Sequence, residues 1–321
     1  MQKLFLHIGQ HKTGTKSLQR FLATNRQVLY QERVIYPDFL GIPPCHHFAR
    51  YYGFGIKTNT VEENNEVERV IKTIKNDAIS NNKDIVISSE IMFSNVSEDK
   101  LQKIKNEFKD FEIKVICFLR RQDTYAESHY RQMIKMGHTY TFDEYLQISS
   151  FDWNVQLEIY EKVFSVNNIK IIPFEDETFQ DCDIYDLFLD IIHIKEKSKF
   201  VKLTEYINVS FSNEITEVIR LYNLYFSQIE IFDKDKILLM FTEYVSSNRV
   251  SIGNFDYFTS KDRLGFLEKY ATSNASLSLK FSCKNPFIFK YNQVSIKNES
   301  DIELCSFDKM LYILMDILLK K

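Results

Sequence analysis

The sequence has few of the residues that mark fibrous, linker-rich or disulfide-stabilised proteins. Its 321 residues include eight glycines, five prolines, five cysteines and one tryptophan. So little glycine and proline excludes a collagen-like or low-complexity chain. The cysteines are odd in number, widely spaced and without a CxxC pair, which argues against a disulfide framework and a zinc site. We therefore expect a globular protein of a reducing compartment with no bound metal.

The chain also lacks an excess of one charge and long apolar runs. Its 41 basic and 44 acidic residues give a net charge of −3 at pH 7, which is unlike a polyanion-binding protein, so any anion site must be local. No apolar run approaches the roughly 20 residues of a membrane-spanning helix, and no secretory leader precedes Leu4. We expect a cytoplasmic protein without a nucleic-acid partner, and the oligomeric state is not predicted.

The apolar content is high enough for a full core. It amounts to 44% of the residues, with 14% aromatic, which suits one large domain or two small ones. In the first half, short apolar strands alternate with helical stretches, the pattern of an α/β fold with a parallel sheet covered on both faces. The predicted strands are 4–8, 84–88, 113–119 and 169–173. The predicted helices are 15–32, 61–81, 98–108, 123–135 and 154–164.

The second half reads as mainly helical. Predicted amphipathic helices are 184–194, 213–229, 234–247, 261–279 and 301–319. The sequence therefore predicts an α/β core over residues 1–182 and a helical lid or extension over 183–321, packed on the same domain. In such a sheet the ligand crevice lies at the carboxyl ends of the strands.

A loop that suits a phosphate follows the first predicted strand. Residues 4–18 read LFLHIGQHKTGTKSL, in which Gly9 and Gly14 bracket a turn that runs into a helix. Backbone N–H groups at such a turn bind phosphate oxygens. A nucleotide triphosphatase loop would need GxxxxGK[ST], but here Thr15 stands before Lys16 and the lysine is one residue late. The strands 84–88 and 113–119 also lack a final Asp that could hold magnesium.

The loop resembles the 5′-phosphosulfate loop of sulfotransferases that use 3′-phosphoadenosine 5′-phosphosulfate (PAPS). The family pattern is Lys, Ser or Thr, Gly, Thr, then Thr or Ser, and residues 12–15 read KTGT, with Lys16 where Thr or Ser is more common. A second family element is an Arg after a strand and a Ser eight residues later, which bind the 3′-phosphate. Arg120 and Ser128 have that spacing, and Tyr130 completes the usual SxY. Segments 208–223 and 270–281 resemble weaker elements of bacterial glycan sulfotransferases.

The resemblance implies a P-loop-like three-layer fold, PAPS as the sulfuryl donor, no metal, and a carbohydrate or glycan precursor as acceptor. The residues that it assigns to the donor are His11, Lys12, Thr13, Gly14, Thr15, Lys16, Ser17, Arg120 and Ser128. Lys12 is also predicted to be catalytic, because it could stabilise charge on the departing phosphate. The planar donor fork of an arginine also suits a phosphate.

Three residues are candidates for the base that accepts the acceptor's proton. Glu90 follows the strand 84–88 in an SSE context that is common in the family, although a structural salt bridge would explain it equally well. His46 and His47 lie in a predicted loop where the acceptor should enter, and each also fits a packing role.

Two other functions are compatible with the sequence. A nucleotide-dependent kinase is the alternative enzyme, because residues 9–17 nearly match a P-loop. A non-catalytic nucleotide-binding protein would bind the same ligand and transfer nothing. A small metabolite or a lipid is also open as the acceptor.

Overall fold

The computed structural model describes most of the chain, and the described residues fall into two units. They are residues 1–41, 43–179, 182–203, 211–226, 239–240, 243, 256–281 and 315. The first unit comprises Met1–Arg121, Asp152–Glu205 and Thr272–Phe289. The second comprises Gln122–Phe151, Tyr206–Ala271 and Lys290–Lys321. The predicted boundary between residues 182 and 183 falls inside the first unit, and the division into a core and a lid stays a prediction.

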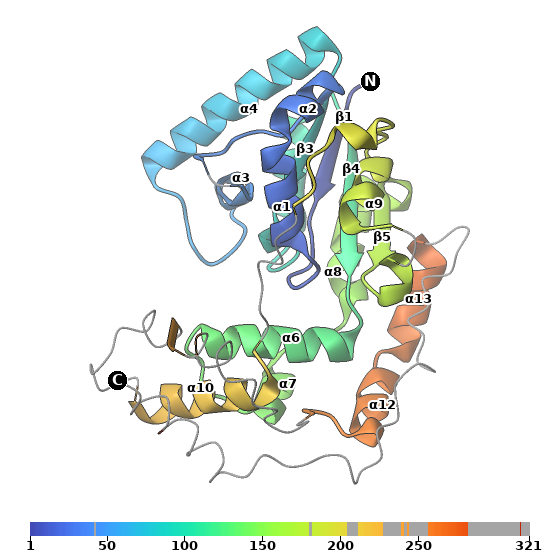
Figure 1. The fold of residues 1–321 in the computed structure, drawn as a ribbon. Coiled ribbons are helices and arrows are strands. Elements are labelled where there is room, and N and C mark those ends of the chain that lie inside the picture. The colour runs from blue at the N-terminus through green and yellow to red at the C-terminus, as the bar shows by residue number, and fades with distance from the viewer. Residues whose placement is uncertain are drawn as a thin grey trace. The chain divides into compact units, whose positions relative to one another are not determined.

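A five-stranded parallel sheet forms the centre of the first unit (Figure 1). Its order is β2-β3-β1-β4-β5. The strands are β1 (Lys3–His7), β2 (Val34–Ile35), β3 (Asp84–Ser88), β4 (Glu112–Leu119) and β5 (Ile169–Pro173). The predicted α/β class with a helix-flanked parallel sheet is confirmed. Only β2 was not predicted, because two residues are too few to show a periodicity.

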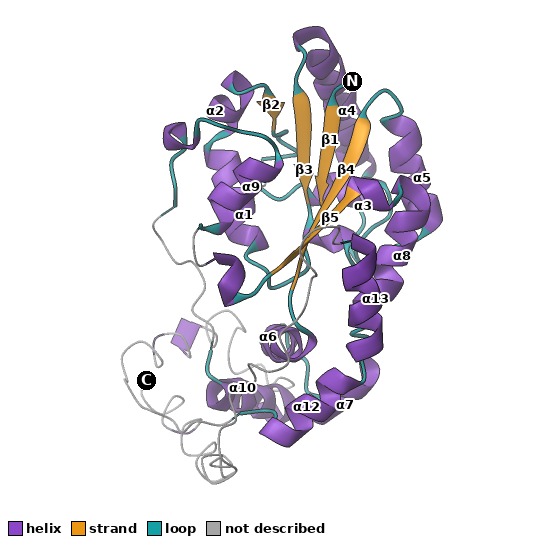
Figure 2. Ribbon diagram, turned by 90° about the vertical axis from the view of Figure 1, so that its right-hand side faces the viewer, coloured by secondary structure: helices purple, strands orange, loops and turns teal. Residues whose placement is uncertain are grey.

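The central strands are apolar because helices cover both faces of the sheet. Leu4, Leu6, Val86, Val115 and Phe118 are all fully buried. Figure 2 shows α1 (Thr15–Thr24) and α9 (Ile184–Ile191) on one side and α5 (Glu98–Glu107) and α8 (Trp153–Phe164) on the other. A parallel strand buried on both faces needs continuous rather than alternating hydrophobicity, and the sequence has it.

The predicted helix over residues 15–32 is two helices, α1 and α2 (Arg26–Gln31). Asn25 lies between them, with its side-chain Nδ2 donating to the Phe21 carbonyl at 2.9 Å and its Oδ1 accepting from the Val201 N–H at 2.9 Å. Asparagine competes for backbone hydrogen bonds in this way, which explains the break. The apolar periodicity continues from α1 into α2, so the sequence pattern does not show the break.

The prediction that His46 and His47 lie in a loop is wrong, because both residues lie in the short helix α3 (His46–Tyr51). The Cys45 N–H donates to the Ser88 carbonyl at 2.9 Å, so the start of α3 is anchored at the carboxyl end of β3. Six residues are too few to establish a helical period, and Pro43 and Pro44 precede them. The first unit also contains α4 (Val61–Asn81), as predicted.

The second unit is helical where it is described. Its helices are α6 (Gln122–Lys135), α7 (Phe142–Ile148), α10 (Asn213–Phe226) and α12 (Ser260–Glu268). The helix predicted over residues 261–279 is instead α12 and α13 (Ala271–Phe281), separated by a turn at residues 269–270. The described residues do not include Asn208 or Ser210, most of the predicted helix 234–247, or the predicted helix 301–319 apart from residue 315. Among the described residues, no helix has both the length and the apolar character needed to cross a membrane.

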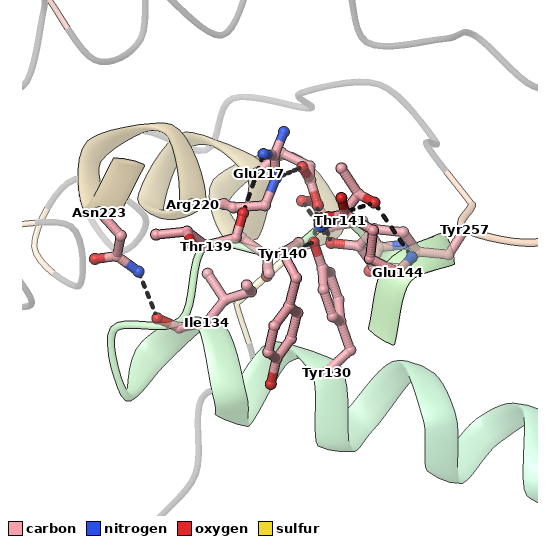
Figure 3. Close-up of polar contacts among 12 residues, drawn as sticks. Tyr130, Ile134, Thr139, Tyr140, Thr141, Glu144, Glu217, Arg220, Asn223 and Tyr257 are labelled. Carbon is pink, nitrogen blue, oxygen red and sulfur yellow. Dashed lines mark hydrogen bonds and ion pairs between the residues drawn. The ribbon is translucent and has the colours of Figure 1, made fainter. Parts of the chain in front are cut away.

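Glu217 of α10 accepts hydrogen bonds from three donors of the second unit and so links α10 to α6 and to the segment before α12 (Figure 3). Its Oε1 accepts from the hydroxyls of Tyr130 at 2.9 Å and Tyr257 at 3.1 Å, and its Oε2 accepts from Arg220 Nε at 2.6 Å. Asn223 Nδ2 donates to the Ile134 carbonyl at 2.8 Å, and this carbonyl also accepts from the Gly137 N–H at 2.9 Å, so the side chain of α10 adds a second bond at the last turn of α6. The Tyr130 hydroxyl therefore has a structural partner inside the unit.

Gly9 offers a test of how tightly the loop after β1 packs. Its φ is +64°, and a Cβ added there would lie 2.8 Å from Glu90 Cβ. Gly41 has a similar φ of +71°, but an added Cβ meets nothing within 4 Å in the described chain. We expect Gly41→Ala to cost only the left-handed conformation, roughly 1–2 kcal/mol. Gly9→Ala should cost about 1–3 kcal/mol more through overpacking.

Urea denaturation of both variants would measure the difference in the free energy of unfolding. Equal losses for the two would mean that the Glu90 backbone moves aside freely, and the close packing would be refuted.

Candidate functional site

The loop from Gly9 to Ser17 connects the carboxyl end of β1 to α1. Gly9, Lys12 and Gly14 adopt left-handed φ values of +64°, +69° and +71°. Gly14 is the N-cap of α1, and no side chain caps the helix. The first N–H groups of α1 thus have no side-chain cap, which leaves the positive end of the helix open to an anion.

The threonines of the loop stabilise its shape. Thr13 Oγ1 donates to the Gln10 carbonyl at 2.7 Å, and Thr15 Oγ1 donates to the same carbonyl at 3.2 Å. Both residues are buried. Their hydroxyls are therefore used within the loop, and the contact of Thr13 and Thr15 with the donor stays a prediction. Ser17 is half-buried and its Oγ lies 3.3 Å from the Tyr185 hydroxyl.

Two lysines give the loop its positive charge. Lys16 is exposed, and Lys12 is half-buried. Beneath the loop, Cys117 Sγ donates to the Gly9 carbonyl at 3.0 Å, and this thiol is fully buried. The base of the loop is thus held by β4 while its lysine-bearing part lies nearer to solvent.

Arg120 supports the loop from the end of β4. Its backbone N–H donates to Gln10 Oε1 at 2.9 Å, and its Nη1 donates to the Lys12 carbonyl at 3.1 Å. Its guanidinium lies 5.9 Å from the centre of the Phe174 ring. Arg120 belongs to the first unit, whereas Ser128 is a buried residue of α6 in the second. Their joint binding of a 3′-phosphate stays a prediction.

Glu90 lies where the loop, α1 and α3 meet. It follows β3 and is buried. Gln19 Nε2 donates to Glu90 Oε2 at 2.7 Å, and His46 Nε2 lies 3.6 Å from Glu90 Oε1. The other ring nitrogen of His46 is 2.7 Å from Ser89 Oγ. With Gly9 packed against the Glu90 backbone, the structure brings the predicted phosphate loop and two of the three predicted bases into one cluster.

The cluster holds a charged carboxylate beside a neutral imidazole. Burial opposes ionisation of Glu90, but the charge of His46 in its protonated form, the Gln19 hydrogen bond and a backbone N–H outweigh it, so the pKa of Glu90 lies below its ordinary value. Burial lowers the pKa of His46, although Glu90 acts in the opposite direction. At neutral pH the carboxylate is therefore ionised and the imidazole is uncharged.

Two further histidines surround the same carboxylate. Burial lowers the pKa of His11, with Glu90 opposing and Lys12 adding to the shift. His7 is fully buried. Burial lowers its pKa to about 4, and its Nδ1 lies 2.7 Å from Ser88 Oγ. Both rings are uncharged at neutral pH, so they leave Glu90 as the negative charge of the cluster.

His47 has different partners. Its Nδ1 lies 3.1 Å from Asn59 Oδ1 and 3.7 Å from Glu63 Oε1, and Asn59 Nδ2 donates back to the His47 carbonyl at 2.8 Å. These contacts tie α3 to the start of α4. They favour a packing role for His47 over a role as base.

Sequence reasoning missed Gln19. It lies between Leu18 and the Phe21–Leu22 pair on the apolar face of α1, and only 1% of it is exposed. A polar residue on a buried helix face needs a partner, and that rule was the available signal.

The described residues offer no cluster of three or more His, Cys, Asp or Glu side chains suited to a metal ion. Glu90, the carboxylate predicted as a base, accepts a hydrogen bond from Gln19 and faces His46.

The chain was compared with protein families, curated proteins and solved structures. No protein-family model matches the sequence. An uncharacterized protein of Archaeoglobus fulgidus is 24% identical over 219 residues, which are 68% of this chain and 59% of that protein. The match thus spans less than two thirds of that relative's length.

Two of the solved structures that match this chain are sulfotransferases. The sulfotransferase from Alicyclobacillus acidocaldarius is 18% identical, with a TM-score of 0.41 over 68% of this chain and 94% of that one. Mouse sulfotransferase SULT7A1, complexed with PAP, is 14% identical, with a TM-score of 0.35 over 84% of this chain and 89% of that one. At such low identities and TM-scores these likenesses assign no function, which rests on the residues of the site.

Proposed function

We propose that the chain is a sulfotransferase that moves a sulfuryl group from PAPS to a hydroxyl or amine of an acceptor, a carbohydrate or glycan precursor, in the cytoplasm. One observation carries this proposal. A loop with two lysines and a helix N-terminus without a side-chain cap packs directly against a buried, ionised carboxylate. An anion-binding turn and a candidate base in contact are what transfer from a phosphosulfate to a hydroxyl requires.

The loop suits the phosphosulfate end of the donor. Backbone N–H groups at the start of α1, with Lys12 and Lys16, supply donors and positive charge for its oxygens. The resemblance of residues 12–15, of Arg120 and of Ser128 to the family pattern supports a nucleotide with a 3′-phosphate. When bound, PAPS supplies an activated sulfuryl group. Lys12 stabilises the negative charge that develops on the 5′-phosphate as the bond from sulfur to the phosphate oxygen breaks.

Glu90 accepts the proton of the attacking hydroxyl. Its oxygen Oε2 is held by Gln19, while Oε1 faces His46. In the reaction a bond forms between the acceptor oxygen and sulfur, the bond from sulfur to the phosphate oxygen breaks, and the proton passes to the carboxylate. His46, uncharged and in contact with Glu90, is the second candidate for this proton.

The kinase alternative finds less support in the site. A P-loop kinase places its lysine directly after the second glycine and holds magnesium near the end of a neighbouring strand. Here Thr15 follows Gly14, and β3 and β4 end in Ser88 and Leu119. A carboxylate does follow β3, at Glu90, but it accepts a hydrogen bond from Gln19.

The donor assignment can be tested by thermal denaturation with 3′-phosphoadenosine 5′-phosphate (PAP), the desulfated product, and with ATP plus Mg²⁺. PAP should raise the melting temperature by several degrees at about 100 times its Kd. Arg120→Ala should reduce this shift, but it also removes the contact with the Lys12 carbonyl. Ser128→Ala is therefore the cleaner variant. It should weaken PAP and leave adenosine 5′-phosphate, which lacks the 3′-phosphate, nearly unaffected.

Greater stabilisation by ATP and Mg²⁺ than by PAP would support the kinase instead. Equal weakening of both adenosine nucleotides in Ser128→Ala would refute the 3′-phosphate assignment.

Lys12→Ala should lower turnover far more than it weakens PAP. The charge that Lys12 meets develops in the transition state, and removing one such stabilising group typically costs about 100- to 1,000-fold in kcat. Lys103, an exposed lysine of α5 outside the site, is the control, and Lys103→Ala should leave turnover unchanged. The measurements are steady-state sulfuryl transfer and PAP affinity by calorimetry. Similar losses in turnover and in PAP affinity would reduce Lys12 to a binding residue.

Glu90→Gln should abolish most transfer and leave PAP affinity nearly intact, because it keeps the shape and removes the basicity. General-base assistance is typically worth about a hundred- to ten-thousand-fold in rate. Because the pKa of Glu90 lies below its ordinary value, wild-type activity should persist from neutral into acidic pH and fall only as Glu90 protonates. Transfer assays across pH would show both effects. Near-native turnover of Glu90→Gln, with loss in His46→Ala or His47→Ala, would move the base to a histidine.

A further inference from the structure

Gln19 connects the helix of the phosphate loop to the carboxylate of the cluster. It lies in α1, five residues after the N-cap Gly14, and is almost completely buried. Its Nε2 donates to Glu90 Oε2 at 2.7 Å and lies 3.5 Å from the Ser88 carbonyl. A hydrogen bond to an ionised, buried carboxylate is among the stronger ones in proteins.

The same two elements also touch through their backbones. Gly9, at the start of the loop, leaves room for the Glu90 backbone only because it lacks a Cβ. The loop continues into α1, which carries Gln19 on its buried face. Any rotation or shift of α1 would therefore change the Gln19 hydrogen bond as well as the anion-binding N-terminus of the helix.

The amide of Gln19 has a second property. Its Oε1 is buried and has no hydrogen-bond partner in the part of the chain that the structure describes. An amide offers N–H donors on one side and a carbonyl acceptor on the other. Turned over, Gln19 could accept a hydrogen bond from Glu90 once that carboxyl has taken up a proton. The residue is thus suited to both protonation states of its partner.

We propose that Gln19 is a positioning residue, which orients the Glu90 carboxylate from the helix whose N-terminus binds the donor and which can follow its protonation by turning its amide. The inference rests on the proposed function, since it assigns Glu90 the role of base. It adds a direct mechanical connection between the donor loop and proton transfer.

The ionisation of Glu90 depends on every group that faces it. The groups are His46 from α3, His11 from the loop, His7 from β1, Tyr36 after β2, and a backbone N–H. Gln19 donates a side-chain hydrogen bond directly to the carboxylate, at 2.7 Å. Removing that donor destabilises the ionised form, so the pKa of Glu90 should rise and the acidic limb of the pH–rate profile should move to higher pH.

The test uses Gln19→Met, which is similar in shape but cannot donate, and Gln19→Glu, which adds a like charge. Gln19→Met should move the acidic limb of kcat/KM up by about one pH unit, a roughly tenfold loss below the limb. Gln19→Glu should move it further, because like charges oppose each other's ionisation. PAP affinity should change by less than about threefold for Gln19→Met. The neighbouring exposed residue provides the control, and Arg20→Ala should move nothing.

A second readout does not require activity. Carboxyl ¹³C NMR, with Glu90→Gln used to identify the resonance, gives the pKa of Glu90 directly in each variant. A uniform loss of rate with an unmoved Glu90 titration in both Gln19 variants would overturn the proposal. If the Glu90 titration moves as expected while the wild-type protein transfers no sulfuryl group, Gln19 does control Glu90, and the proposed function fails instead.

Discussion

The close approach of Gly9 to Glu90 is the constraint on which the candidate site depends. A backbone with φ of +64° and no Cβ lets the end of β1 lie directly against the residue that follows β3. Parallel pairing of these neighbouring strands brings their carboxyl ends to the same edge. The glycine-bracketed loop after β1 and the buried carboxylate are thus adjacent because of the sheet, and the side chains of Gln19 and His46 then complete the cluster.

Burial sets the electrostatics of this cluster. Desolvation alone would neutralise a carboxylate, yet Glu90 stays ionised because polar groups converge on it. The same desolvation keeps His7, His11 and His46 uncharged. The result is one localised negative charge beside a lysine-bearing loop, in a chain whose net charge is only −3. Local arrangement rather than overall charge makes the site.

The sequence was most informative where a pattern is repeated or strongly constrained. β3, β5 and α4 have the predicted bounds, because buried strands and a long amphipathic helix leave a clear period. β2 and α3 were missed because each is too short for one. The break at Asn25 depends on a hydrogen bond to Val201, 176 residues away, which no local pattern shows.

The candidate site, like the fold, could be predicted only in part from the sequence. Glu90 and the loop were found because residues at strand ends meet at one edge, whereas the separate partners of His46 and His47 depend on the packing of α3. The sequence did not show that the hydroxyls of Thr13 and Thr15 bond to the Gln10 carbonyl, because the loop conformation decides which acceptor they reach.

The thiol beneath the loop has a practical consequence. Cys117 is fully buried, and burial raises the pKa of its thiol well above its ordinary value. Reaction with an alkylating agent needs an exposed thiolate, so this residue is protected while β4 and the loop stay folded. Its rate of alkylation therefore measures how often the sheet opens beneath the loop after β1, and a ligand that holds the loop against β4 would slow that reaction without touching the sulfur.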